Sequence, residues 1–129
     1  MIAQSLPTNP PTLQEIFDTV VAHLREQGVA CKNSDNCVYR NSAHQACAVG
    51  CLIPDSIYRP ALEENGVVRL YQWNYLPEFF AAYGITTEDT TALELMADLQ
   101  CTHDTNNPIN WELSFSSLAT NYSLTYEPR

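Results

Sequence analysis

Five cysteines and three histidines are the residues of this chain whose side chains could bind a metal ion or act in catalysis. A zinc site built from them would use Cys31, Cys37, Cys47 and His44. Structural zinc sites normally carry paired Cys-x2-Cys or Cys-x2-His ligands, and the chain has no such pair. On an extended strand Cys47 and Cys51 would lie about 13 Å apart, too far to share one ion. We therefore favour buried cysteines that act as small apolar side chains, with no cofactor, and keep a zinc-stabilised domain as an alternative.

A cysteine nucleophile with a histidine base is a second chemistry that these residue types allow. The candidates for such a site are Cys37, Cys47, His44, His103 and Asp104. A reactive cysteine needs an exposed, electropositive setting that favours the thiolate, whereas Cys47 lies in an apolar run of an acidic chain. His103 and Asp104 also fit a structural role at a helix end, where an imidazole meets the negative end of the helix dipole. A non-enzymatic protein is favoured, and a small Cys/His-dependent hydrolase is the alternative.

The distribution of charge indicates which kinds of partner the chain could bind. Fifteen acidic residues against six basic ones give a net charge of −9, and no Lys or Arg lies between residues 70 and 128. Such a surface repels phosphate, which argues against nucleic acid as a partner. It suits a protein partner with a basic surface, and the candidate binding residues are Glu88, Asp89, Glu94 and Asp98. The alternative is that the acidity serves solubility alone.

Helices account for most of the predicted structure. Thr12 and Glu15 form a capping box, and an apolar stripe follows until Gly28 supplies the C-terminal cap. A second long helix is predicted over residues 87–103, with the acids Glu88 and Asp89 in its first turn. Shorter helical segments are predicted from Pro60, Pro77 and Asn110.

The centre of the fold is predicted at residues 37–58, which hold the longest unbroken apolar run, 47–53. A run of this kind between polar residues and a proline is typical of a buried strand, and residues 37–40 would be its hairpin partner. Val49, Cys51 and Ile53 should then be almost free of solvent. Gly50 indicates a bulge or the close approach of a neighbouring backbone. Residues 67–76 fit a third strand or a loop.

The chain is predicted to form one α+β domain, with four or five helices packed on a small antiparallel β-hairpin. Residues 1–11 are predicted as a flexible leader, 12–124 as the domain and 125–129 as a tail. No stretch has the length of a membrane span or the pattern of a signal peptide, so a cytoplasmic protein with reduced thiols is expected. The sequence does not determine the oligomeric state.

Three ordered motifs carry a resemblance to a known group. They are Cys37-x-Tyr-Arg40, Cys47-Ala-Val-Gly-Cys-Leu-Ile-Pro-Asp55 and Leu99-Gln-x-x-His-Asp104, the last followed by Trp111. In this order they resemble an uncharacterised family of small bacterial and phage-encoded proteins. Members tend to have a glycine before the second motif, and residues 41–46 have none. The resemblance implies a phage or bacterial setting and no particular activity.

Aromatic residues add one further candidate for a binding surface. Tyr71, Trp73 and Tyr75 fit a partner-binding patch and fit a core position equally well. Together with the charge, the pattern favours an acidic, non-enzymatic protein that binds or regulates a protein partner.

Overall fold

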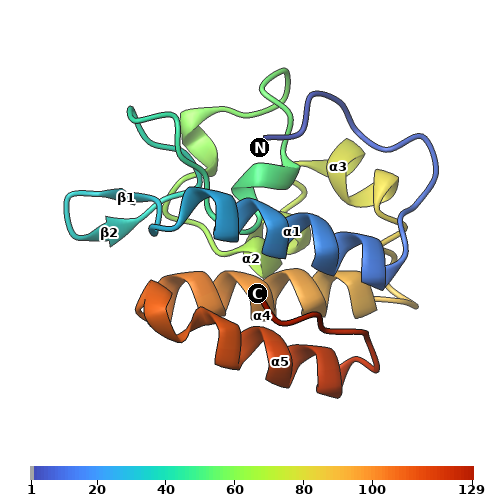
Figure 1. Cartoon of the computed structure of the whole chain (residues 1–129). Helices are drawn as coiled ribbons and strands as arrows, with labels where there is room; N and C mark the ends of the chain where they lie inside the picture. The colour runs from blue at the N-terminus through green and yellow to red at the C-terminus, as the bar shows by residue number, and fades with distance from the viewer. Residues whose placement is uncertain (1) are drawn as a thin grey trace.

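The computed structural model describes residues 2–129, and it consists of helices with one small sheet. The helices are α1 (Leu13–Gln27), α2 (Val67–Gln72), α3 (Pro77–Ala82), α4 (Thr91–Thr105) and α5 (Trp111–Asn121). Short 3-10 turns occur at η1 (Gly50–Leu52), η2 (Pro60–Leu62) and η3 (Pro108–Asn110), and the strands are β1 (Lys32–Asn33) and β2 (Asn36–Cys37). The predicted α+β class is confirmed. Figure 1 shows α1 crossing the molecule, with α4 and α5 on one side and the loops around η1 and α3 on the other.

Helix α1 forms as its sequence predicts. The Thr12 hydroxyl accepts the N–H of Glu15 at 3.1 Å, and the Glu15 carboxylate accepts the N–H of Thr12 at 2.8 Å. Gly28 ends the helix with φ 72°, the left-handed conformation that glycine adopts without strain. The buried apolar stripe is Ile16, Phe17, Val20, Val21 and Leu24.

Helices α4 and α5 lie side by side, joined through η3 (Figure 1). Helix α4 begins at Thr91 instead of residue 87, because residues 86–89 form a separate turn in which the N–H of Asp89 bonds back to Thr86. The Asp89 carboxylate then accepts the N–H of Thr91 at 3.1 Å. The acids Glu88 and Asp89 therefore precede the helix, and the prediction that placed them in its first turn is wrong.

The antiparallel hairpin exists, but it lies earlier in the chain than predicted. Its pairs are Lys32 with Cys37 and Asn33 with Asn36. The predicted strand over residues 47–53 is wrong: this run is a tight turn that contains η1, and the isolated bridge of Arg40 with Ala46 lies just before it. An unbroken apolar run predicts burial and leaves the backbone conformation open.

Burial of that run is confirmed. Val49, Cys51 and Ile53 are each exposed by 1% or less. The backbone groups that a strand would pair laterally are bonded locally, since the N–H of Cys51 reaches the carbonyl of Cys47 and the N–H of Ile53 reaches that of Gly50. The run is therefore the buried centre of the fold in a helical-turn conformation.

The third strand is also wrong. Residues 67–72 form α2, and its buried residues Val67 and Leu70 have the i, i+3 spacing of a helix. Helix α2 contacts α4. Val68 and Trp73 in this segment are 41% and 58% exposed, so the alternation that suggested a strand does not match the burial.

Both ends of the described chain lie against the domain. The N–H of Ala3 bonds to the carbonyl of Cys51 at 2.8 Å, and Ile2 and Leu6 pack against the core. Residues 122–129 run back from the end of α5 along α1 (Figure 1). Among residues 2–129 no helix has the length and apolar character needed to cross a membrane.

Candidate functional site

The structure brings three of the predicted catalytic residues together. Cys37 at the end of β2 lies beside His103 and Asp104 in the last turn of α4, and their ligand atoms lie within 4.8 Å of one another. The other two candidates lie elsewhere. His44 is exposed in a loop, and the Cys47 side chain is fully buried beside Gly50.

Both ring nitrogens of His103 are already bonded. Nε2 accepts the backbone N–H of Cys31 at 2.8 Å, so the ring proton lies on Nδ1. Nδ1 lies 2.7 Å from the Asp104 carboxylate and donates to it. The ring is 1% exposed and stacks on Trp111, with the ring centroids 5.8 Å apart.

This arrangement makes His103 a poor base and a poor metal ligand. With Nε2 accepting from Cys31 and Nδ1 protonated, no lone pair is left to take a proton from the Cys37 thiol. A metal ion on Nδ1 would require an imidazolate, because a proton on Nε2 would face the N–H of Cys31. The donor set therefore argues against both hydrolase and zinc chemistry at this cluster.

The thiols of Cys31, Cys37 and Cys47 are not activated either. Burial, and then the nearby Asp104, raise the pKa of Cys37. Burial raises the pKa of Cys31 to about 12 and places that of Cys47 well above its ordinary value. The alternative zinc set of Cys31, Cys37, Cys47 and His44 does not assemble, since the only group of three candidate ligands in residues 2–129 is the one around His103.

The residues of the three sequence motifs hold the buried turn in place. Arg40 forms an ion pair with Asp55, donates to the carbonyl of Ile53 and lies over the ring of Tyr58. Gln100 accepts the N–H of Val49 at 2.9 Å through Oε1 and donates to Asp104 at 2.8 Å. These contacts give the motif residues a structural role around the buried turn.

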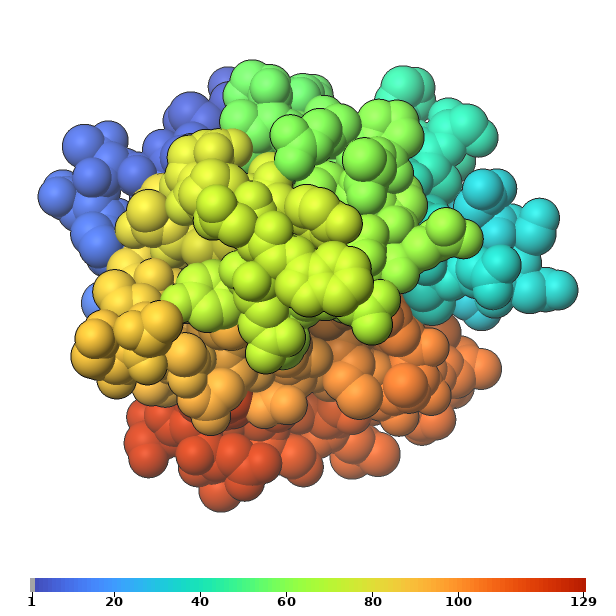
Figure 2. Space-filling view, turned by 180° about the vertical axis from the view of Figure 1, so that it is seen from behind, coloured from blue at the N-terminus to red at the C-terminus, as the bar shows by residue number. Residues whose placement is uncertain are grey.

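A hollow between α2 and α4 contains two of the predicted partner-binding acids. We call it the acidic pocket; its volume is about 430 Å³. Its lining residues are Val68, Tyr71, Gln72, Thr90, Leu93, Glu94, Ala97, Asp98 and Tyr122. Figure 2 shows the face on which α2, in yellow-green, rests on α4, in gold to orange.

Each carboxylate of the acidic pocket is held by one hydroxyl. Thr90 donates to Glu94 Oε2 at 3.0 Å, and Tyr122 donates to Asp98 Oδ2 at 2.6 Å. Burial and this contact with Asp98 raise the pKa of Tyr122, so its hydroxyl remains a donor at neutral pH. The other oxygen of each carboxylate has no hydrogen-bond donor within residues 2–129.

The other residues predicted to bind a partner lie outside the pocket. Glu88 and Asp89 are exposed in the turn before α4 and do not line it. Of the aromatic candidates, Tyr71 lines the pocket, while Trp73 is exposed under the guanidinium of Arg69, 4.8 Å from the ring centroid.

The sequence patterns did not predict the apolar floor of the acidic pocket. Val68, Leu93 and Ala97 belong to two helices that only the folded chain brings together. A detectable sign was the wide apolar surface of α4, where Leu93 and Ala97 share one face by their i, i+4 spacing with Glu94 and Asp98 beside them.

Comparison of the chain with protein families, curated proteins and solved structures found no match in any of the three. The acidic pocket and its neighbours are therefore the features from which a function can be inferred.

Proposed function

We propose that this chain is a non-enzymatic, acidic binding protein that takes a basic side chain of a protein partner into the acidic pocket. The resemblance of its motifs supports a phage or bacterial setting, in which such a protein would regulate another protein. One observation carries the proposal. Glu94 and Asp98 each have one carboxylate oxygen that no donor of residues 2–129 bonds, and it lies beside the apolar side chains of Val68, Leu93 and Ala97.

Lysine and arginine match this combination of surfaces. Their alkyl stems cover apolar surface while the charged head stays near water or a carboxylate. Tyr71 and Tyr122 add aromatic rings, which attract a cation at their faces. A partner held in this way would bind faster at low salt, because the surrounding acidic residues attract its basic surface over about a Debye length.

The proposal is tested with pairs of short peptides that differ only at a central residue, lysine in one and norleucine in the other, between apolar flanks. Binding is followed through the amide signals of Ala97 and Tyr71 in NMR titrations. The lysine peptide should shift these signals and the norleucine peptide should not. Glu94→Gln with Asp98→Asn should weaken binding of the lysine peptide roughly fivefold or more.

Glu88→Gln with Asp89→Asn is the matched control, since it removes the same two charges outside the acidic pocket. This variant should bind the lysine peptide nearly as the unmodified chain does. Equal loss in both double variants would mean that only the general acidity matters. Equal shifts from lysine and norleucine peptides, or none from either, would refute the proposed function.

A further inference from the structure

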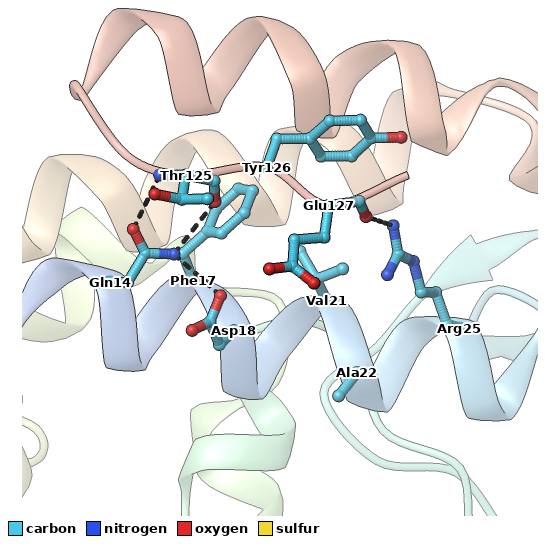
Figure 3. Close-up of a pocket in the computed structure, with 9 residues that line it drawn as sticks. All are labelled: Gln14, Phe17, Asp18, Val21, Ala22, Arg25, Thr125, Tyr126 and Glu127. Atoms are coloured by element: carbon cyan, nitrogen blue, oxygen red, sulfur yellow. Dashed lines mark hydrogen bonds between the residues drawn. The ribbon is translucent and has the colours of Figure 1, made fainter. Parts of the chain in front are cut away.

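The face of α1 that carries Gln14 and Arg25 holds the extended residues 124–127 (Figure 3). The N–H of Thr125 donates to Gln14 Oε1 at 2.8 Å, and Gln14 Nε2 donates to the carbonyl of Thr125 at 3.1 Å. One side-chain amide thus makes both bonds that a neighbouring β-strand would make. Because these bonds involve only the backbone of residue 125, they would hold any extended segment in the same register.

Tyr126 supplies the side-chain contact of this segment. Its hydroxyl donates to Glu112 Oε1 at 2.7 Å, and Arg25 binds the same carboxylate through two nitrogens at 2.9 and 2.6 Å. Arg25 also donates to the carbonyl of Glu127 at 2.8 Å. Tyr126 is therefore held through its hydroxyl, between backbone contacts at residues 125 and 127.

The chain's own segment fills this site incompletely. A hollow of about 520 Å³ remains between the segment and α1, lined by Phe17, Val21, Ala22 and Asp18 among others. Figure 3 shows the Glu127 side chain directed from the segment toward α1, on the side where Asp18 lies. Within residues 2–129 the Glu127 carboxylate has neither a hydrogen-bond donor nor a basic partner, so an acid is poorly matched to this position.

We propose that this face of α1 is a binding site for an extended segment of a partner protein in which a tyrosine is followed directly by lysine or arginine. The chain's own residues 124–127 occupy the site when the partner is absent. The alkyl stem of the basic residue would cover Val21 and Ala22, and its charge would reach Asp18. This surface lies apart from the acidic pocket and shares no lining residue with it.

The affinity expected for a free peptide depends on its competition with the chain's own residues 124–127. A covalently attached segment acts at an effective concentration of about millimolar or more, so a free peptide binds the unmodified chain weakly. Weakening the attached segment should make the site available. Tyr126→Ala in the full-length chain removes the bond to Glu112 and leaves the site on α1 unchanged.

The experiment measures fluorescence anisotropy of labelled peptides with the full-length chain. The probe has the sequence of residues 122–129 with lysine in place of Glu127, and it is compared with the unaltered sequence. The lysine peptide should bind Tyr126→Ala more tightly than it binds the unmodified chain, and roughly fivefold more tightly than the unaltered peptide binds. Asp18→Asn should remove that preference for lysine, and Gln14→Ala combined with Tyr126→Ala should abolish binding.

Two controls separate this site from general attraction between charges. A lysine peptide with alanine at the position of Tyr126 has the same charge and should not bind. Every chain in this experiment also carries Glu94→Gln and Asp98→Asn, which remove the charges of the acidic pocket, so failure at this site is distinct from failure at the acidic pocket. Absence of binding to Tyr126→Ala at millimolar peptide, or equal binding of the alanine peptide, overturns the inference. Tyr126→Phe, which loses only the bond to Glu112, serves as a second variant and should bind the lysine peptide with intermediate affinity.

Discussion

The Nε2 atom of His103 accepts the backbone N–H of Cys31 across 72 positions of sequence, at 2.8 Å. This bond joins the end of α4 to the residue just before the hairpin. Both partners are buried, with Cys31 at 0% and His103 at 1% exposure. The bond therefore holds two distant segments together in a place where water cannot replace it.

Replacing this imidazole should destabilise the fold. His103→Phe keeps a ring that can stack on Trp111 but leaves the N–H of Cys31 without an acceptor, which should lower the free energy of unfolding by about 1–3 kcal/mol. Urea denaturation measures the change. The matched control is His44→Asn at an exposed position with φ 61°, which asparagine tolerates, and its effect should stay within about 0.5 kcal/mol. A His103→Phe variant as stable as the unmodified chain would show that the bond to Cys31 contributes nothing.

A methyl group at Gly50 should disrupt the buried turn. A Cβ there would lie 2.3 Å from the backbone carbonyl oxygen of Tyr39, a contact that only backbone movement can relieve. Gly50→Ala should lower the free energy of unfolding by about 1–3 kcal/mol in urea denaturation. Gly66→Ala is the control, since nothing lies within 4 Å of its Cβ and its φ of −66° suits alanine, and it should change stability by less than about 1 kcal/mol. Equal effects of the two substitutions would contradict the close approach of Tyr39.

The five thiols should react in three groups. All are unpaired; Cys101 is exposed, Cys37 is half-buried and the other three are buried. With a thiol reagent at pH 8, Cys101 should react first. Cys37 should react more slowly, because burial and Asp104 raise its pKa and so lower its thiolate fraction. The remaining three should react only after denaturation. Cys101→Ser should remove the fast phase alone, and a fast phase that persists in this variant would point to an activated cysteine elsewhere.

His23 should make stability depend on pH near neutrality. Burial lowers its pKa from the ordinary value of 6.5, while its bond to the carbonyl of Ala46 acts in the opposite direction. A histidine with a lowered pKa in the folded state binds its proton more readily when unfolded. Its contribution to stability is therefore complete above about pH 6.5 and is lost as the pH falls through the lower, folded-state pKa.

The measurement for His23 is the free energy of unfolding at pH 7.5 and 5.5 for the unmodified chain and His23→Gln. The unmodified chain should lose more stability between these pH values than the variant does. The difference between the two chains isolates His23, because other titrating groups act in both. Parallel pH dependence in the two chains would rule out a lowered pKa for His23.

Local sequence patterns determined much of this protein. The capping box of Thr12 and Glu15, the apolar stripe and Gly28 define α1 almost to the residue, because each interaction lies within a few positions of the chain. Burial of residues 47–53 follows equally from their apolar composition. The excess of acidic residues between positions 70 and 128 follows directly from the amino-acid composition.

The tertiary structure decided what those patterns leave open. Residues 47–53 form a turn instead of a strand because the Gln100 side chain, 51 positions away, accepts the N–H of Val49, and Arg40 binds the carbonyl of Ile53. His103 is bonded at both nitrogens only because the chain brings Cys31 to its ring. The acidic pocket likewise needs α2 laid against α4. A buried backbone group must find a partner somewhere, and when that partner is a side chain far along the sequence, no local pattern records it.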